Sequence, residues 1–465
     1  MNLFGQDMIF VSNLELIHKI FGDRERFQNE PGFRNSLSYS LPGESSMFGS
    51  EGETWKARHR ILEPMQKLNF LRFHTKTMSR TMSKMVGLVG DLARSRKVPT
   101  VDFFTILQRA TIEVIGHAIF GVDLGVLPDD LKDLSELEQE PLLAKTFAIV
   151  LDAITARINL PSVLWPLQYY LSGERKAALE MQALFKRLLE EKKVQLAGSG
   201  DDEKAGVEGT TLLELILRFK RDNPEEGERV YPETEIFQDC LSLFGAGYDT
   251  TTITTSFLLY HLAEHQEVQN AVYEEIMGIV REENDTEDEG SISYAQTEKL
   301  EYLGRVIKES QRVVPAVPSL LRYTTTDTEV LGVKIPKGVR ASVITSHSRP
   351  PNIIFIFVSL QASVFMNLQA LYNSEKLFPE SGTFNPDRWS STEPGEKPAF
   401  FFGHGTRRCF GQKLALLQIK VFIFHLLQGH RVELHPGQKL ETEFIFSTNP
   451  KGKKMPLLLI PREKS

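Results

Sequence analysis

The chain has 465 residues, of which 41% are hydrophobic, so it can bury a large core. Its net charge of −7 and the lack of a basic tract argue against a nucleic-acid partner. The two cysteines, Cys240 and Cys409, are too few for a disulfide framework, which indicates a reducing compartment. The first residues show neither a secretory signal nor an apolar spanning segment.

The N-terminal part begins with a strand signal that leads into a helix signal. Residues 8–21 indicate a short strand running into a helix capped near Ser12 or Asn13. Residues 32–52 are rich in Gly, Ser and Pro and predict a long loop. From residue 54 to residue 198 a helical period dominates, broken only at prolines.

The second half contains one long periodic segment between acidic connections. Residues 198–203 and 282–290 are acidic and indicate surface connections. Residues 232–265 predict a single long helix of about 50 Å. Short strands are expected late in the chain, at residues 323–326, 330–335 and 455–460. The pattern predicts a mainly helical protein with a small strand content.

A glycine-bracketed loop at residues 402–411 carries Cys409, and an apolar helix pattern follows from Gln412. A reactive thiolate needs hydrogen-bond donors and positive potential, which a helix N-terminus supplies. Gly405 and Gly411 can take backbone conformations closed to other residues. A buried structural cysteine in a glycine turn is the alternative interpretation.

This loop resembles the haem-ligand signature F-x-x-G-x-R-x-C-x-G of the cytochrome P-450 family. The five specified positions are occupied by Phe402, Gly405, Arg407, Cys409 and Gly411. The resemblance implies a mainly α fold with small β-sheets, in which haem b lies between a long distal helix and the cysteine loop. It also implies that Cys409 is the axial ligand of the haem iron and that Arg407 pairs with a propionate. A thiolate ligand favours O–O cleavage.

Residues 246–251, Ala-Gly-Tyr-Asp-Thr-Thr, resemble the oxygen-activation motif of that family and lie within the long helix. The glycines of this region each cost about 1 kcal/mol against alanine in a helix interior. We infer a local opening of the helix in which the Thr250 hydroxyl bonds to the Ala246 carbonyl. Asp249 and Thr250 would then relay protons. An ordinary helix with a close glycine packing contact is the alternative.

A carboxylate and a guanidinium, Glu309 and Arg312, lie three residues apart on one helix face. With Arg388 in residues 384–389, they resemble the E-x-x-R helix and the F-x-P-x-R-[FW] segment of the family. The resemblance assigns these three residues a structural role, in which they fix the cysteine loop. Arg322 is similar to a propionate-binding arginine of the family.

An early helix pattern resembles the W-x-x-x-R helix of the family, with Trp55 at its start and His59 where arginine is usual. Either side chain can donate a hydrogen bond to a propionate, but the charge of a histidine depends on pH. Arg58 and Arg60 are interpreted as a solvated basic face.

Two further sets of residues have weaker signals. His261 and His265 are four residues apart but lack the glutamate of a zinc motif, so we expect them on a helix surface. Substrate-pocket residues are expected in 33–48, near Phe244 and in 313–320.

The chain departs from the family pattern in two places. Residues 338–378 span a connection roughly twenty residues longer than is usual for the family. We interpret residues 344–364 as an insertion outside the working fold, within a single domain of residues 1–465. The apolar helix and proline hinge of membrane-bound members have no counterpart, so the chain is interpreted as N-terminally short and membrane association stays open.

The resemblance, to microsomal-type fungal members in particular, implies a haem-thiolate monooxygenase. Such an enzyme inserts one oxygen atom from O2 into an apolar small molecule, here with secondary metabolism as a setting, and takes electrons from an NADPH–cytochrome reductase. The expected location is intracellular: the endoplasmic reticulum surface if a longer form has an anchor, otherwise the cytoplasm. One alternative is a reductase-independent peroxide isomerase or dehydratase, against which the pair Asp249 and Thr250 argues. The other is a catalytically impaired or non-haem-binding relative.

Overall fold

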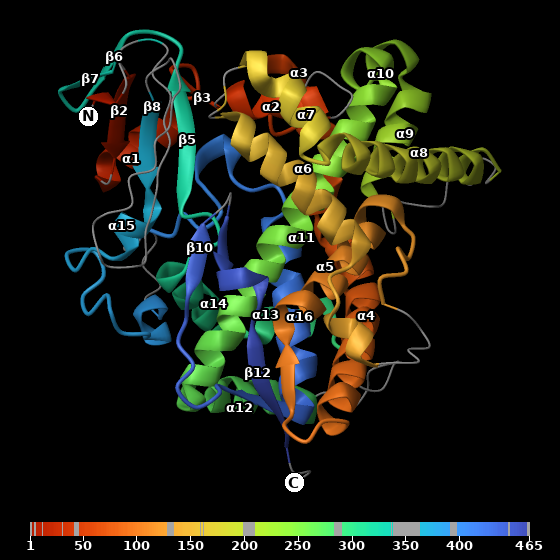
Figure 1. Cartoon of the computed structure of the whole chain (residues 1–465), viewed down its shortest axis with the longest axis vertical. Helices are drawn as coiled ribbons and strands as arrows, with labels where there is room; N and C mark the ends of the chain where they lie inside the picture. Colours follow the sequence, from red (N-terminus) through yellow and green to blue (C-terminus); the bar gives the residue numbers. More distant parts are fainter. Residues whose placement is uncertain are drawn as a thin grey trace.

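The computed structural model describes residues 2–3, 6–11, 13–29, 31–40, 46–127, 134–158, 160, 162–198, 210–282, 291–335, 337, 363–390, 398–444 and 447–462. A large helical body fills most of the molecule, and a small sheet lies beside it with α1 and the N-terminus (Figure 1). None of the helices in these ranges combines the length and apolarity that crossing a bilayer requires.

The α-helices account for most of the described residues. In chain order they are α1 (Leu14–Gly22), α2 (Pro31–Ser40), α3 (Gly52–Leu62), α4 (Leu68–Arg94), α5 (Phe103–Phe120), α6 (Leu142–Ile158), α7 (Trp165–Leu171), α8 (Glu174–Gly198), α9 (Leu212–Asp222), α10 (Pro224–Val230), α11 (Glu233–Glu264), α12 (Gln266–Glu282), α13 (Tyr294–Lys299), α14 (Glu301–Val313), α15 (Leu368–Tyr372) and α16 (Gln412–Gly429). Short 3-10 turns are η1 (Glu63–Gln66), η2 (Leu134–Glu138), η3 (Ser162–Leu164), η4 (Pro386–Trp389), η5 (Gly405–Arg407) and η6 (Lys451–Lys453).

The strands form small sheets. They are β1 (Asn2–Leu3), β2 (Gln6–Val11), β3 (Phe27–Gln28), β4 (Thr100–Asp102), β5 (Ser319–Thr324), β6 (Thr328–Val330), β7 (Val333–Ile335), β8 (Ser363–Asn367), β9 (His430–Glu433), β10 (Thr442–Phe444), β11 (Thr448–Pro450) and β12 (Pro456–Pro461). Among the described residues, the largest sheet has the order β1-β2-β8-β5-β3, and a second has the order β4-β12-β9. The remaining pairs are the hairpins β6-β7 and β10-β11.

The longest helix, α11, crosses the centre of the helical body (Figure 1). It begins after Pro232 and ends at Glu264, just before its capping residue His265, so the expected long helix over residues 232–265 is confirmed. Its 32 residues correspond to about 48 Å. Most of its length is buried against α5, which lies alongside it. Because α11 is covered on several sides, it buries polar side chains such as Asp239 and Thr252 together with its apolar ones.

The first strand and helix agree with the sequence pattern. β2 ends at Val11, and Asn13 caps α1 because its side chain accepts a hydrogen bond from the Leu16 N–H at 3.0 Å. α16 likewise starts at Gln412, as expected. The acidic connections at residues 199–203 and 283–290 lie outside the described residues.

The expected loop over residues 32–52 is wrong in its first part, because α2 occupies Pro31–Ser40. Proline is favoured in the first turn of a helix. The serine-rich sequence has a low helix propensity, and contacts with α6 stabilise the helix instead. The Ser36 hydroxyl donates to the Ile154 carbonyl at 2.9 Å. Arg157 also donates to the Ser36 carbonyl and to the Ser40 hydroxyl. Tertiary contacts therefore override a weak local preference.

Two hydrophobic cores lie in the described part of the chain. The larger core joins most of the helices between α2 and α16, and it includes Phe244, Leu414 and Leu417. The smaller core lies between α1 and the largest sheet and includes Phe21, Met366 and Phe400. The cysteine loop connects the two, because Phe400 precedes it and Leu414 follows it.

The expected insertion at residues 344–364 overlaps a strand at its C-terminal end. Ser363 and Val364 belong to β8, which pairs in parallel with β2 and antiparallel with β5. These two residues are therefore part of the fold, and the boundary of the expected segment is wrong by two residues. Residues 344–362 lie outside the described residues.

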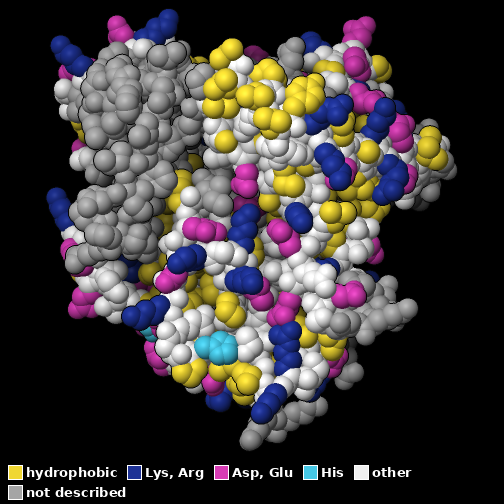
Figure 2. Space-filling model, viewed as in Figure 1, with side chains coloured by type: hydrophobic (Ala, Val, Ile, Leu, Met, Phe, Trp, Pro, Cys, Tyr) yellow, Lys and Arg dark blue, Asp and Glu magenta, His cyan; other side chains and the backbone are white. Residues whose placement is uncertain are grey.

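Exposed apolar side chains gather around α7, next to α2 and α6. They form the yellow area at the top of the space-filling view (Figure 2). Leu171 is 75% exposed and Tyr170 is 69% exposed, with Val163 and Leu167 close to them in the sequence. An apolar surface of this kind commonly marks an interaction site.

Candidate active site

Cys409 lies between η5 and the first turn of α16. Its backbone N–H donates to the Phe402 carbonyl at 2.7 Å, which closes the loop. Gly403 and Gly405 both have φ of +72°, a left-handed conformation that favours glycine. A Cβ on Gly405 would also lie 3.0 Å from the carbonyl oxygen of Phe21. The shape of the loop thus depends on glycine at these two positions.

The backbone at Gly411 differs from the expected one. Its φ of −82° is open to other residues, and a Cβ built there meets no described atom within 4 Å. The expectation of a restricted conformation holds for Gly405 and is wrong for Gly411. Gly403, which the sequence signature does not specify, takes the left-handed conformation instead.

The two cysteine thiols lie in different surroundings. Solvent reaches the side chain of Cys409, whereas Cys240 is buried in α11. Solvent reaches one side of the Cys409 sulfur, but protein atoms surround the rest of it. This partial desolvation raises the pKa of the thiol. The backbone N–H groups of Gly411 and Gln412 and the charge of Arg408 act in the opposite direction. A metal ion that binds such a sulfur removes its proton.

Three arginine side chains gather around Glu51 beside the cysteine loop. Arg24 Nη2 lies 3.0 Å from Glu51 Oε1. Arg407 also pairs with the Glu51 carboxylate and stacks on Trp55, with the guanidinium 4.1 Å from the indole centroid. Arg322 is buried, and it interacts electrostatically with Arg24, Arg407 and Glu51. Three guanidinium groups against one carboxylate leave a net charge of +2 (3 − 1) in this cluster.

The electrostatics of this arginine cluster show a shortage of negative charge. Burial lowers the pKa of Arg322 to about 9, with the charges of Arg24 and Arg407 adding to the effect and Glu51 opposing it. Burial likewise lowers the pKa of Arg407 to about 10. Within the described residues, Arg24 Nη1 is buried without a hydrogen-bond partner. The cluster therefore favours an additional anion.

His59 lies beside this cluster. Its ring centroid is 5.0 Å from that of Trp55 and 5.7 Å from that of Phe410. Burial lowers the pKa of His59, while Glu63 opposes the shift and Arg407 adds to it. A neutral imidazole has one N–H, so His59 can donate one hydrogen bond on this side of the site.

The glycine-containing stretch of α11 is closely packed. A Cβ on Gly245 would lie 1.8 Å from Phe147 Cζ, and a Cβ on Gly247 would lie 2.6 Å from Ile115 Cδ1. α11 continues as a helix through these residues. The Thr250 hydroxyl donates to the Ala246 carbonyl at 2.7 Å, as the sequence indicated. The glycines are thus explained by close packing, and the expected side-chain bond exists beside it.

Asp249 turns toward the hairpin of β10 and β11. Its Oδ2 accepts a hydrogen bond from the Ser447 hydroxyl at 3.1 Å. Burial raises the pKa of Asp249 to about 6, while Lys453 and Ser447 oppose the shift and Asp152 adds to it. A carboxyl group with such a pKa exchanges protons readily near neutral pH.

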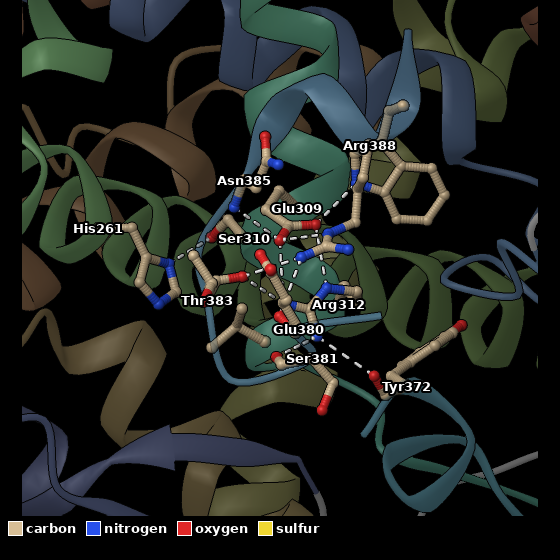
Figure 3. Close-up of polar contacts among 12 residues, drawn as sticks. His261, Glu309, Ser310, Arg312, Tyr372, Glu380, Ser381, Thr383, Asn385 and Arg388 are labelled. Atoms are coloured by element: carbon tan, nitrogen blue, oxygen red, sulfur yellow. Dashed lines mark hydrogen bonds and ion pairs between the residues drawn. The ribbon is translucent and has the colours of Figure 1, made fainter. Parts of the chain in front are cut away.

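Glu309 is the centre of a buried network that joins α14 to η4 (Figure 3). Arg312 donates to its carboxylate from Nε at 3.0 Å and from Nη2 at 2.9 Å, and Arg388 donates from Nε at 2.9 Å. The Asn385 backbone N–H and Trp389 Nε1 donate to the same carboxylate. Burial alone would raise the pKa of Glu309, but these donors hold it below its usual value.

The interpretation of His261 as a surface residue is wrong. His261 is buried between α11 and α14, and its Nδ1 lies 3.0 Å from the Ser310 hydroxyl (Figure 3). Burial lowers the pKa of His261 to about 3. Its ring stacks on Phe384, and so does the half-buried ring of His265. The two histidines therefore pack against Phe384, which lies just before η4.

The interpretation of Arg58 as a solvated residue is also wrong. Its Nη2 lies 3.0 Å from Glu235 Oε2 and its Nη1 lies 3.9 Å from Asp239 Oδ2, both on α11. The guanidinium also lies over the ring of Tyr231. Arg60, two positions along α3, is exposed as expected. Two residues on a helix are about 200° apart, so one faces α11 and the other faces solvent.

Sequence reasoning missed Arg24 and Glu51 of the arginine cluster. Arg24 belongs to a run of charged residues, 23–26, that is typical of a surface turn, and no local pattern marks it. Phe244 was expected near the substrate pocket but is fully buried against Phe185 and Tyr248. It therefore belongs to the core.

Comparison with known proteins defines the class. The family model described as cytochrome P-450 matches residues 1–349 and 357–457. This chain belongs to the cytochrome P-450 family. Members of this family are haem-iron proteins with oxidoreductase activity of the monooxygenase type, and the cofactor is haem b.

The similar curated proteins are distant relatives. A probable cytochrome P-450 4d21 of Drosophila melanogaster is 24% identical, over 96% of this chain and 82% of its own length. A putative cytochrome P-450 CYP13A5 of Caenorhabditis elegans is 25% identical, over 98% and 85%. Cytochrome P-450 3A25 of Mus musculus is 24% identical, over 86% and 72%.

A solved structure shares the fold. The crystal structure of a cytochrome P-450 (CYP102L1) superposes with a TM-score of 0.76 at 20% sequence identity, covering 98% of this chain and 89% of the other. The expected fold class, mainly α with small sheets, is confirmed.

The residues of the site fit haem b. The arginine cluster has an excess positive charge and a buried N–H group of Arg24 without a partner, which suits the propionate groups of haem. Cys409 offers an accessible sulfur at a helix N-terminus, where a thiolate is stabilised. The same site thus combines a positively charged cluster that could hold an anion with an accessible sulfur that could bind iron.

Proposed function

We propose that this protein is a haem-thiolate monooxygenase that inserts one oxygen atom from O2 into an apolar organic small molecule. The observation that supports this most directly is the loop that presents Cys409 next to the arginine cluster. Cys409 would bind the iron. Arg407, Arg322 and Arg24 would hold the propionate groups, with Trp55 and His59 beside them.

Two residues of α11, Asp249 and Thr250, would transfer protons in this reaction. When bound, the haem supplies oxygen activation with electrons from a reductase. The Thr250 hydroxyl, fixed by its bond to the Ala246 carbonyl, can pass a proton onward. Asp249, with its pKa near 6, can accept and release a proton at the pH of the cell.

Structural residues keep the sulfur in place in this proposal. The network of Glu309, Arg312 and Arg388 fixes the segment that leads into the cysteine loop. Gly403 and Gly405 shape the loop itself, and the Phe402 carbonyl accepts the hydrogen bond of the Cys409 backbone N–H.

The proposal also covers the extent of the domain, the electron donor and the location of the protein. We propose a single domain of residues 1–465, with residues 344–362 as an insertion. The electron donor is an NADPH–cytochrome reductase, and the location is intracellular, with secondary metabolism as the setting. The apolar surface around α7 supports contact with the endoplasmic reticulum membrane, because exposed Leu171 and Tyr170 are suited to a bilayer interface.

The test begins with the carbon-monoxide difference spectrum of the reduced protein. We expect the spectrum typical of a thiolate ligand in the wild type and in Cys240→Ala, and its loss in Cys409→Ala. Equal spectra from the two variants would contradict the role of Cys409. Purified protein that takes up no haem would instead indicate an impaired relative.

The second step separates the possible reactions. With a reductase, NADPH and labelled O2, a monooxygenase gives products that contain one labelled oxygen atom. Turnover of organic peroxides without a reductase, and without incorporation of label, would identify a peroxide isomerase or dehydratase instead.

A further inference from the structure

A histidine and two carboxylates meet at the C-terminal end of α5. Glu113 and His117 lie four residues apart on α5, so they share one face of the helix. Asp123 comes from the loop that follows Gly121, the C-cap of this helix. Each of the three side chains has one ligand atom within 4.8 Å of the ligand atoms of the other two. Among the described residues, no other three metal-ligating side chains lie so close together.

The loop after α5 is fixed against the helix. The buried Glu113 carboxylate accepts hydrogen bonds at 2.8, 3.3 and 3.1 Å from the backbone N–H groups of Leu124, Gly125 and Val126. The Leu124 side chain packs on Gly116, where a Cβ would lie 2.6 Å from Leu124 Cδ1. These contacts hold the residue before Leu124, which is Asp123, beside the helix. A binding site needs rigid support of this kind.

The charges at this end of α5 are mainly negative. Burial raises the pKa of Glu113, the N–H groups of Val126 and Gly125 oppose the shift, and the carboxylate of Asp123 adds to it. In the part of the chain that the structure describes, neither carboxylate has a lysine or arginine within ion-pair distance. Lys192 lies near the helix end but pairs with Glu214 at 3.6 Å. The negative end of the α5 dipole adds to the attraction for a cation.

We propose that Glu113, His117 and Asp123 form a binding site for a divalent transition-metal ion, with Zn²⁺ as the ion that fits best. An imidazole among the ligands favours transition metals over Mg²⁺ and Ca²⁺, which prefer oxygen ligands alone. Zinc commonly takes three such ligands and a water molecule in a tetrahedron, with ligand atoms roughly 3.4 Å apart. Rotation of the exposed Asp123 side chain brings the three ligand atoms to that spacing.

The bound ion ties the end of α5 to its loop, and neighbouring helices contact both parts. Lys84 of α4 donates to the Leu127 carbonyl at 3.1 Å. A Cβ on Gly121 would lie 2.9 Å from Cγ2 of Thr211, the N-cap residue of α9. The ion therefore stabilises the junction of α4, α5 and α9 by binding the folded chain alone. This role goes beyond the proposed function, because none of these residues belongs to the haem site.

The competing interpretation is a hydrogen-bonded pair that binds no metal, since His117 Nε2 lies 2.5 Å from Asp123 Oδ1. The first experiment distinguishes the two. Haem-loaded protein is dialysed against buffered ZnCl2, and elemental analysis gives the ratio of zinc to haem iron. Haem occupies the Cys409 sulfur, so zinc cannot bind there. We expect saturation at about one zinc ion per iron.

Variants assign the zinc to these side chains. His117→Gln and Asp123→Asn change partly or fully exposed residues, so neither should prevent folding. Each should weaken zinc binding at least about tenfold, because even the loss of a group that supports a metal ligand commonly costs that much. A zinc-to-iron ratio near zero in the wild type, or equal zinc affinity in the wild type and His117→Gln, would overturn the proposal.

His265 is a matched control. It also lies between two carboxylates, with Nε2 3.6 Å from Glu264 and Nδ1 3.5 Å from Glu267. These contacts involve opposite nitrogens of the ring, so the three groups do not converge on one point. His265→Gln should leave zinc binding unchanged. A loss as large as that of His117→Gln would show that zinc binds surface histidines in general, and the proposed site would be wrong.

Hydrogen exchange tests whether the ion ties the loop to α5. At a zinc concentration about 100 times the Kd, the amides of Leu124, Gly125 and Val126 should exchange at least about tenfold more slowly in the wild type. The same zinc concentration should have little effect on these amides in Asp123→Asn. Unchanged exchange in the zinc-saturated wild type would overturn the role of the ion at this junction.

Discussion

Gly245 in α11 provides the sharpest test of the packing around the oxygen-activation motif. A methyl group there would lie 1.8 Å from Phe147 Cζ and 2.2 Å from Phe147 Cε2. Favourable carbon–carbon contacts are about 3.5–4.0 Å, so the ring must move by roughly 2 Å. That movement would disturb the edge contact of Phe147 with Tyr248, whose ring centroids are 5.3 Å apart.

The expected magnitude follows from two opposing terms. Overpacking a well-filled interior costs about 1–3 kcal/mol. Replacing glycine by alanine inside a helix raises the free energy of unfolding by about 1 kcal/mol. We therefore expect Gly245→Ala to lower the free energy of unfolding by up to about 2 kcal/mol, since the half-buried Phe147 can move only partly aside.

Gly278 in α12 and Gly304 in α14 are matched controls, because a Cβ at either position meets no described atom within 4 Å. Gly278→Ala and Gly304→Ala should each raise the free energy of unfolding, by up to about 1 kcal/mol. Urea unfolding followed by circular dichroism measures all three variants. The packing argument is refuted if Gly245→Ala is stabilised to the same extent as the two controls.

Three further predictions concern the site and the connection before β8. Thr250→Ala should keep haem and substrate binding but divert reducing equivalents into peroxide, which an assay of product and peroxide per NADPH measures; unchanged product yield would contradict the relay role. Glu309→Gln should lower the free energy of unfolding by about 3–5 kcal/mol and reduce haem retention, because it removes the negative charge that two buried guanidinium groups share, whereas Glu301→Gln at an exposed position in the first turn of α14 should lower it by less than about 1 kcal/mol. Deleting residues 344–362, which spares β8, should improve soluble expression and haem occupancy; a deletion variant that fails to fold while the full chain binds haem would show that the segment belongs to the fold.

The sequence allowed the longest elements to be predicted well. α11 has a sustained helical period with Pro232 before it and His265 after it, so both ends fell within one residue of the prediction. The start of α16 was equally clear, because Gly411 precedes an apolar helical period. These signals are local, and local patterns do not depend on distant partners.

The features that escaped prediction depend on contacts between distant segments. α2 is a serine-rich helix held by Arg157 of α6, 117 residues after Ser40. The burial of Arg58 depends on carboxylates of α11 that its own neighbours do not reveal. Arg24 and Glu51 come together only in the folded chain, where the residues after α1 meet the residue that precedes α3. In each case a charged or polar residue is buried because a remote partner compensates it.

The position of the cysteine loop between two hydrophobic cores affects how the molecule unfolds. Phe400 is anchored in the smaller core and Leu414 in the larger one, so Cys409 lies on the short stretch of chain that joins them. The arginine cluster spans the same boundary, with Arg322 in β5 of the largest sheet and Arg407 before α16. A cofactor held by both groups ties the two cores into one cooperative unit. Haem binding would then protect the sheet against local unfolding as strongly as it protects the helices.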